Sequence, residues 1–227
     1  RDLHSFPTRR SSDLTNADTI LAAGGVGGLY ERSTNFPCMT GDACRICRVH
    51  GVALEHMDYV QFHPTSLYTG STGRAFLISE SCRGEGAILL NAKGERFVDE
   101  LQPRDVVSAA VYRQMREDGL PFVRLSFERI PRGVTCRHFH NIRERCLEEG
   151  YDICEGPIPV APAQHYLMGG ILVDQDSRSS MEHLYAVGET SCSGVHGRNR
   201  LASNSLLESL VFSRLAARDI VRRRHRA

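Results

Sequence analysis

The stretch LYAVGETSCSGVHGRNRLASNSLLESLVFSRLAARDI, residues 184–220, decides the fold. Its first four residues form a short apolar run closed by Gly188 and Glu189, which predicts a buried strand ending in a turn. After a polar loop, Ser205 and Glu208 have the spacing of a capping box at the start of a helix. Apolar residues then recur at helical spacing: Leu206, Leu207, Leu210, Val211, Leu215 and Ala216. A strand, a polar loop and a helix start form a natural site for an electron-rich group, because a helix N-terminus presents free N–H groups and the positive end of its dipole.

Two potential cations, His196 and Arg200, lie in this loop before the expected helix. Together with the helix N-terminus they favour an anionic ligand. An ordinary strand–loop–helix with a solvated arginine explains the same pattern, and periodicity alone favours that simpler interpretation.

The composition sets bounds on the class of protein. A chain of 227 residues can form one or two domains with a hydrophobic core. The net charge of +1 gives no sign of nucleic-acid binding, and the longest apolar runs are too short to span a membrane. Eight cysteines without a framework spacing, and no secretory signal, predict a protein of the reducing cytoplasm.

The first 14 residues, RDLHSFPTRRSSDL, are basic, serine-rich and without periodicity. We predict that residues 1–14 are a non-native extension or a disordered tail. They are therefore left out of the fold prediction.

Residues 188–208 carry a resemblance to a known family. Gly188 and Glu189, followed by HGRNRLASNSLLE, resemble the flavoprotein family that includes succinate dehydrogenase, fumarate reductase and L-aspartate oxidase. The ASNSLLE form is most similar to the L-aspartate oxidase branch. The resemblance runs from about residue 19 to residue 220, and it departs from the family at Arg198, where a small residue is usual.

The resemblance implies FAD as the cofactor. Glu189, Ser205 and Leu206 are expected to contribute to its site, with the helix start stabilising negative charge on the reduced flavin. The run TILAAGG at residues 19–25 predicts a short strand ending in glycines, which in the family lies near the flavin. The sequence has no Gly-x-Gly-x-x-Gly followed by a helix and an acidic residue, so we expect the ADP half of the cofactor site to be missing from this chain.

Residues 40–51 predict a helix that begins near Asp42 and ends near Gly51. The resemblance places Asp42 at the flavin site, and a helix N-cap is an equally good role for it. Cys44 and Cys47 have a zinc or redox spacing, but no second pair of ligands lies near in the sequence. We predict that both are small buried cysteines on the helix and assign no metal site.

Two histidine motifs predict the substrate site. His63 stands in QFHPT and His165 in HYLMGG, and in the resembling family these histidines face the two carboxylates of a dicarboxylate. Ser79 is expected to assist His63, since the family commonly has a threonine there, and Arg200 to assist His165. The glycine pair of HYLMGG permits the backbone to approach a flat ligand closely.

Three neighbouring segments carry structural predictions only. Residues 76–80 predict a strand, after which Arg83 and Glu85 are expected to form an internal ion pair or to hold the glycine turn. Residues 90–97 predict a hairpin with a polar turn. Residues 136–146, in the part of the chain that matches the family least, predict a helix and carry no assigned chemistry.

Arg104 is the candidate catalytic residue. It follows Pro103 at a predicted helix start, where a cation opposes the helix dipole, and such local conflicts tend to mark function. In the resembling family this arginine is the acid/base residue. Free arginine is a poor base because its pKa lies far above neutrality, so the site must lower that pKa or use a proton relay.

These predictions combine into an α/β chain. Residues 15–60 and 167–227 are expected to form part of a Rossmann-like FAD-binding domain, and residues 61–166 an inserted α+β substrate-capping domain. Relative to the family, the chain is expected to be truncated at both ends.

The resemblance implies FAD-dependent oxidation of L-aspartate to iminoaspartate, the first step of quinolinate and NAD synthesis, with oxygen or fumarate as electron acceptor. A hydride would pass from Cα to the flavin, Arg104 would handle the proton, and the capping domain would exclude water. A functional link to quinolinate synthase follows. Two alternatives stay open: a succinate dehydrogenase or fumarate reductase flavoprotein acting on succinate or fumarate, and an inactive fragment that at most binds ligands.

Overall fold

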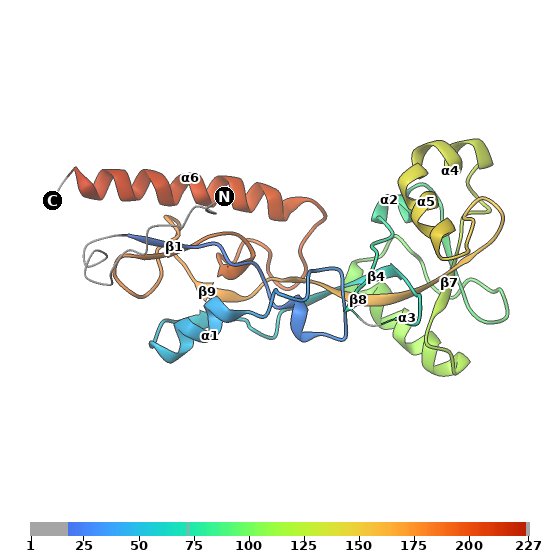
Figure 1. Cartoon of the computed structure of the whole chain (residues 1–227), viewed down its shortest axis with the longest axis horizontal. Helices are drawn as coiled ribbons and strands as arrows, with labels where there is room; N and C mark the ends of the chain where they lie inside the picture. The colour runs from blue at the N-terminus through green and yellow to red at the C-terminus, as the bar shows by residue number, and fades with distance from the viewer. Residues whose placement is uncertain (1–17, 72, 226–227) are drawn as a thin grey trace, which may run out of the picture.

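The computed structural model describes residues 18–71 and 73–225, so the predicted tail at residues 1–14 lies outside the described part of the chain. The molecule is elongated (Figure 1). Helix α6 (Asn204–Arg224) lies at one end, which we call the α6 end (residues 18–59 and 168–225, without β2). The other end is built on a larger sheet, and we call it the sheet end (residues 60–167 with β2).

Short parallel strands organise the α6 end. β1 (Thr19–Leu21) pairs in parallel with β10 (Leu184–Ala186), which confirms the predicted strands at both places. A second sheet has the order β11 (Ser191–Cys192), β9 (Gly170–Leu172), β3 (Leu54–Glu55). Helix α1 (Asp42–Val49) lies against β3 and β9 and buries Cys44 and Cys47, as predicted. Two short 3-10 turns, η2 (Gly27–Leu29) and η3 (Gly188–Thr190), follow β1 and β10.

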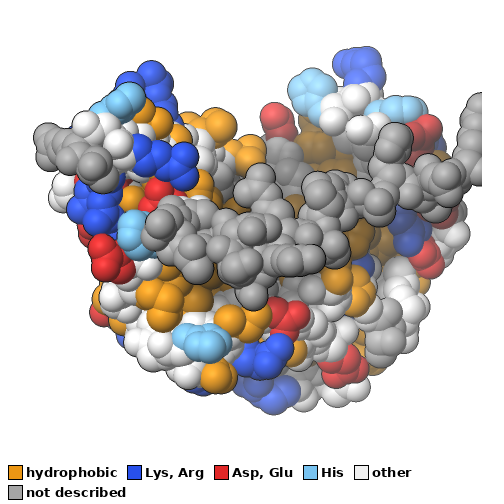
Figure 2. Space-filling model, turned by 60° about the vertical axis from the view of Figure 1, so that its left-hand side comes forward, with side chains coloured by type: hydrophobic (Ala, Val, Ile, Leu, Met, Phe, Trp, Pro, Cys, Tyr) orange, Lys and Arg blue, Asp and Glu red, His pale blue; other side chains and the backbone are white. Residues whose placement is uncertain are grey.

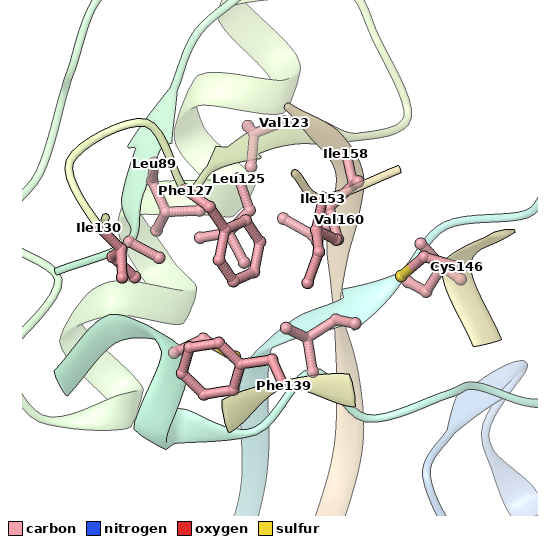
Figure 3. Close-up of a cluster of buried hydrophobic side chains, with 14 of the residues drawn as sticks. Leu89, Val123, Leu125, Phe127, Ile130, Phe139, Cys146, Ile153, Ile158 and Val160 are labelled. Atoms are coloured by element: carbon pink, nitrogen blue, oxygen red, sulfur yellow. The ribbon is translucent and has the colours of Figure 1, made fainter. Parts of the chain in front are cut away.

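A six-stranded sheet forms the other end. Its order is β5 (Gly73–Arg74), β2 (Arg32–Ser33), β8 (Ile158–Leu167), β7 (Val123–Ser126), β6 (Ile88–Leu90), and β4 (Val60–Leu67) also pairs with β8. Helices α2 (Glu80–Gly84), α3 (Arg104–Asp118), α4 (Arg132–His138) and α5 (His140–Glu148) surround it (Figure 1). Leu89, Leu125, Phe127, Ile158 and their neighbours point toward one another in one apolar cluster (Figure 3). The chain is therefore mixed α/β, as predicted.

The ladder between β4 and β8 contains two bulges. Its paired residues around them are Gln61 with Tyr166, Phe62 with Gln164, His63 with Ala163, and Ser66 with Ala161. His165 is thus an extra residue on β8, and the segment after His63 holds one extra residue on β4. A bulge bends its strand and redirects side chains. Both candidate histidines therefore lie at or beside a bulge.

Four local predictions were wrong. The N-cap of helix α6 is Ser203 and not the predicted Ser205, and no side chain caps the helix, because Glu208 is hydrogen-bonded elsewhere. Residues 76–80 make only an isolated bridge to β4 before α2 begins at Glu80. The predicted helix over 136–146 is broken at Phe139 into α4 and α5. Asp42 is the first residue of α1, and Gly41 occupies the N-cap.

Other predicted contacts are replaced by different partners. Arg83 pairs with Glu80 and donates to the Glu100 backbone carbonyl, while Glu85 is exposed.

The hairpin at residues 90–97 is confirmed by an antiparallel bridge between Leu90 and Arg96. The sulfur atoms of Cys136 and Cys154 are paired, a link that the cysteine spacing did not predict.

Helix α6 exposes most of its apolar face. Leu206, Leu207 and Leu210 are 60–70% exposed, whereas Ala216 is buried. Hydrophobic side chains lie between charged ones on the face shown in Figure 2. Within residues 18–71 and 73–225, no helix is both long and apolar enough to cross a membrane.

Candidate functional site

Four basic side chains from separate segments converge where the two ends of the molecule meet. His63 lies on β4, Arg104 starts α3, His165 lies on β8 and Arg200 lies in the loop before α6; all but the half-buried His165 are buried. The rings of His63 and His165 have centroids 5.3 Å apart. The four residues named from the sequence motifs are thus brought together.

The pKa values of these side chains are shifted by burial and by the charges of their neighbours. Burial, then the charges of Arg104 and Arg200, lower the pKa of His165 to about 4. Burial, His165 and Arg104 hold the pKa of His63 well below its usual value. Burial and the charge of Arg104 also lower the pKa of Arg200. Both histidines are therefore neutral at neutral pH, and the positive charge resides on the two arginines.

Gln61 connects the sheet end to the loop that carries Arg200. Its Oε1 accepts from Arg104 Nη1 at 2.9 Å, and its Nε2 donates to Asn199 Oδ1 and to the Arg200 carbonyl, each at 2.8 Å. All its hydrogen-bonding groups are engaged, so it fixes Arg104 relative to Arg200. Sequence reasoning gave Gln61 no role, although it lies two residues before His63 and shares its motif.

Glu80 is the second residue that sequence reasoning missed. Its Oε2 accepts from Arg104 Nη2 at 2.7 Å and its Oε1 from Arg83 Nη2 at 3.1 Å. Burial raises the pKa of Glu80, but the hydrogen bonds and charges of Arg104 and Arg83 outweigh burial and lower it overall. The Glu80 side chain is 37% exposed, so a carboxylate in contact with solvent joins two buried guanidinium groups. Its only sequence signal was its place next to Ser79.

Among the four converging basic side chains, two buried nitrogen atoms lack partners in the described part of the chain. They are Nε2 of His63 and Nε of Arg200. Buried polar atoms are normally hydrogen-bonded, and an unpartnered group is costly. Nε of Arg200 is a donor, and Nε2 of His63 becomes one when it carries the ring hydrogen. The pair therefore suits a ligand rich in acceptor oxygen atoms.

Ser79 has a different immediate partner from the one expected. It is the N-cap of α2, and its Oγ accepts from the backbone N–H of Ser81 at 3.3 Å. The N-cap role holds Glu80 at the first position of that helix. A contact between Ser79 and a ligand stays a prediction.

The predicted cofactor residues lie in three places. Glu189 Oε1 accepts from the Leu167 backbone N–H at 2.9 Å and fills the space where a Cβ at Gly25 would lie, 2.2 Å away. Asp42 accepts from Thr40 and Arg45 at the surface. Ser205 and Leu206 form the first turn of α6, with Arg200 Nη1 3.4 Å from Ser205 Oγ. Their contacts with a cofactor stay predictions.

The glycine pair after His165 is approached by protein and not left open. A Cβ at Gly169 would lie 1.9 Å from the His56 carbonyl oxygen, and one at Gly170 2.5 Å from the Thr190 carbonyl oxygen. These glycines therefore permit close backbone packing between β9 and its neighbours. The approach of a flat ligand to the backbone at these glycines stays a prediction.

A buried carboxylate anchors α6 to the site. Glu208 accepts from Tyr166 Oη at 3.1 Å, is 2.8 Å from His196 Nε2, and also accepts from Ser193. The guanidinium carbon of Arg200 lies 4.4 Å from the centroid of the Tyr166 ring. His196 is thus hydrogen-bonded to Glu208, so it is not free to bind an anion beside Arg200.

Arg198, the departure from the resembling family, is directed to the surface. Its guanidinium carbon lies 4.7 Å from the centroid of the Tyr59 ring, which in turn stacks on His56 at 4.1 Å. Among residues 18–71 and 73–225, no group of three or more His, Cys, Asp or Glu could hold a metal ion.

Comparisons with known proteins give a consistent set of relatives. The family described as FAD binding domain matches residues 6–206. The L-aspartate oxidase of Clostridium perfringens is 54% identical over 202 residues, which are 88% of this chain and 46% of that protein. The L-aspartate oxidase of Neisseria meningitidis is 47% identical over 221 residues, 94% of this chain and 44% of that protein. A solved quinol fumarate reductase of E. coli aligns with a TM-score of 0.79 and 38% identity over 87% of this chain and 37% of that one. The chain spans about half the length of the curated relatives it matches.

Proposed function

The chain belongs to the FAD-binding-domain family, and we propose that it is the part of an L-aspartate oxidase that carries most of the dicarboxylate site. The reaction would be FAD-dependent oxidation of L-aspartate to iminoaspartate. The observation that carries this proposal is the convergence of His63, Arg104, His165 and Arg200 in one buried place. A link to quinolinate synthase and a cytoplasmic location are part of the same proposal.

The division into domains is proposed on the same basis. The larger apolar cluster is drawn entirely from residues 67–160, within the proposed capping domain at 61–166. The two smaller clusters are drawn from residues 21–57 and 171–220, within the proposed FAD-binding parts. Separate cores of this kind support two structural units that meet at the site.

The residues at the α6 end fit FAD. The carboxyl ends of the parallel strands β1 and β10 meet at one edge, where Glu189 contacts Gly25, and such edges bind ligands in open α/β sheets. The long helix α6 starts beside Arg200 without a side-chain cap, so the positive end of its dipole lies there. An electron-rich ring edge would be stabilised by this end of the helix. When bound there, FAD supplies the acceptor for the hydride that leaves the substrate carbon.

The two carboxylates of the substrate are proposed to bind on opposite sides of the site. His63, assisted by Ser79, would hold one, and His165 with Arg200 the other. Because both rings are neutral, each would bind through a single ring N–H and not as a cation. Arg200 would supply the charge and, through its unpartnered Nε, a further donor.

Arg104 is proposed as the acid/base residue, with Glu80 and Arg83 as its relay. The sequence left open whether its pKa is lowered or a relay is used. The chain of contacts from Arg104 through the Glu80 carboxylate to Arg83 supports the relay, because Glu80 reaches solvent while the arginines are buried. Glu80 would return the proton of Arg104 to solvent after each turnover.

The test is an anaerobic flavin spectrum of the purified chain mixed with FAD, recorded before and after L-aspartate. Bleaching by L-aspartate and not by succinate is the expected result. Arg104→Ala is expected to slow bleaching by about 100-fold or more while flavin stays bound. Unchanged bleaching in that variant would remove Arg104 from the chemistry. If the chain binds no flavin, the same spectra are recorded on the longer relative from Clostridium perfringens and on its variant at the matching arginine.

A succinate dehydrogenase or fumarate reductase activity is the second candidate. It is favoured by the structural similarity to the E. coli quinol fumarate reductase, since a dicarboxylate without an amine would meet the same basic side chains. Bleaching by succinate in place of L-aspartate would select it.

A further inference from the structure

In the part of the chain that the structure describes, the Nδ1 atom of His165 has one side-chain partner, the hydroxyl of Thr34. The distance from Thr34 Oγ1 to Nδ1 is 2.8 Å. Thr34 directly follows β2, and its backbone N–H donates to the Gln164 carbonyl at 2.9 Å. Arg74 Nε donates to the Thr34 carbonyl at 3.2 Å. The hydroxyl is therefore held in place beside β8 by its own backbone.

The ring of His165 is neutral and has a single N–H to place. Burial and the nearby arginines disfavour its protonation, as its pKa of about 4 records. A neutral imidazole has one nitrogen that donates and one that accepts. If the hydrogen were on Nδ1, Nε2 would present a lone pair to the substrate carboxylate and repel it. Binding of an anion thus requires the hydrogen on Nε2.

The position of Thr34 decides between the two tautomers. Its single hydroxyl hydrogen can go to Nδ1 at 2.8 Å or to the Gln164 carbonyl at 3.4 Å. That carbonyl already accepts from the Thr34 backbone N–H, and the longer contact is the weaker one. We propose that Thr34 is a positioning residue, which donates to Nδ1 of His165 and so keeps the ring hydrogen on Nε2 for an anionic ligand. The identity of that ligand as a dicarboxylate rests on the proposed function.

His63 shows that this arrangement is specific to His165. Nδ1 of His63 lies 3.1 Å from the Thr65 carbonyl oxygen, 3.3 Å from the Thr65 backbone nitrogen and 3.5 Å from the Thr65 hydroxyl oxygen. The carbonyl accepts, the backbone N–H donates, and the hydroxyl donates to the Ile78 carbonyl at 3.1 Å, so neither tautomer of His63 is imposed by a single partner. Thr34, in contrast, is a lone hydroxyl with one short contact to the ring.

Removal of the hydroxyl would open the Nδ1 side to water. Thr34 and His165, with Arg74, Phe76 and Arg145, line a cavity of about 480 Å³. A water molecule there can either donate to Nδ1 or accept from it. In Thr34→Val we therefore expect a mixture of tautomers, whereas Thr34→Ser keeps the hydroxyl and the Nε2–H form.

The experiment is a long-range ¹H–¹⁵N NMR spectrum of the histidine rings in the ¹⁵N-labelled full chain near pH 7.5. His165→Gln identifies the His165 signals by their loss. The expected result is a hydrogen on Nε2 in the wild type and in Thr34→Ser, and a mixture in Thr34→Val. Malonate, an unreactive dicarboxylate, should bind roughly tenfold more weakly to Thr34→Val, since a charge-assisted hydrogen bond is lost in part of the population. Thr69→Val, at an exposed threonine whose hydroxyl is hydrogen-bonded to Ser71, is the matched control and should change neither result.

A hydrogen on Nδ1 in the wild type would overturn the proposal, as would a tautomer that is the same in Thr34→Val. If Thr34→Val does not fold, the wild-type spectrum decides alone. The spectrum needs neither flavin nor turnover, so it stands apart from the proposed function. An Nε2–H ring, together with bound flavin that L-aspartate never reduces, would refute the oxidase and leave the role of Thr34 intact.

Discussion

The two ends of the molecule bury their apolar side chains to very different extents. The sheet end has one cluster that includes Leu89, Leu125 and Ile158, all without exposed surface. The α6 end has two smaller clusters, and three leucines of α6 remain 60–70% exposed. The site draws His63, Arg104 and His165 from the well-buried end and only Arg200 from the other. Most of its geometry is therefore fixed by the part of the chain that supplies its own core.

The largest expected effect is in the sheet-end cluster. Leu125→Ala should lower the free energy of unfolding by about 3 kcal/mol, because a fully buried leucine loses its transfer energy and leaves a cavity. Urea unfolding followed by circular dichroism measures the change. A loss no larger than that of an exposed leucine would contradict the contrast between the two ends.

The next effect is a pH dependence that arises at the α6 end. Burial raises the pKa of Glu189 to about 7. In the unfolded chain this carboxyl releases its proton near pH 4.3, so between the two values the folded state binds more protons and stability falls as the pH rises. Relative to Glu189→Gln, the wild type should lose about 2 kcal/mol between pH 4.5 and pH 8, a figure reduced for partial exposure.

That pH difference is measured by urea titrations of both proteins at several pH values. Glu182→Gln, at a 75% exposed side chain, is the control and should follow the wild type. Parallel curves for the wild type and Glu189→Gln would show that the carboxyl is ionised in the folded protein.

A smaller effect is expected where α6 is attached to the site. Glu208→Gln should destabilise the chain by about 1.5 kcal/mol, because a buried carboxylate that accepts from Tyr166, Ser193 and His196 loses its charge. Although burial raises the pKa of Glu208, the hydrogen bonds from His196 and Ser193 lower it overall. Its contribution should therefore persist at neutral pH and be lost only on acidification.

Thermal or urea unfolding of Glu208→Gln beside Glu85→Gln, an exposed control, measures this effect. Equal stability of the two variants would mean that the network around Glu208 does not hold α6.

The smallest effect is the counterpart of the first. Leu210→Ala makes the same chemical change at a residue that is 70% exposed, and should alter the free energy of unfolding by less than about 0.5 kcal/mol. A loss close to that of Leu125→Ala would show that the apolar face of α6 is covered in solution and would remove the difference between the two ends.

Elements with a clear local period were predictable from the sequence. The strand at residues 184–186, helix α1 with its buried cysteines, and the start of α3 after Pro103 all follow from apolar spacing and helix-start chemistry. The partners of polar side chains were not. Glu208 has the spacing of a capping box, yet its hydrogen bonds go to residues 12 to 42 positions away, and such distant contacts override local preference.

The candidate site divides in the same way. The motifs identified four basic residues that the structure brings together, because each stands in a distinctive local string. Gln61 stands in the string of His63 and Glu80 stands next to Ser79, but neither was assigned a role, since their function depends on reaching Arg104 from 43 and 24 residues away. Thr34 has no motif and depends on pairing with a strand 131 residues later.

The two bulges of β4 and β8 restrict how the length of this chain can change. Between the pairs Gln61–Tyr166 and Ser66–Ala161 the two strands contain the same number of residues. The register of the ladder is therefore the same before and after the two bulges. A deletion in one strand alone would shift the register of the remaining ladder by one residue and turn each side chain to the opposite face of the sheet, where both faces are buried. Matching deletions in both strands would keep the phase while removing the irregularity that redirects the histidines. The register is therefore kept only when an insertion or deletion in β4 is matched by one in β8. Such a matched change can remove the candidate site without disrupting the sheet.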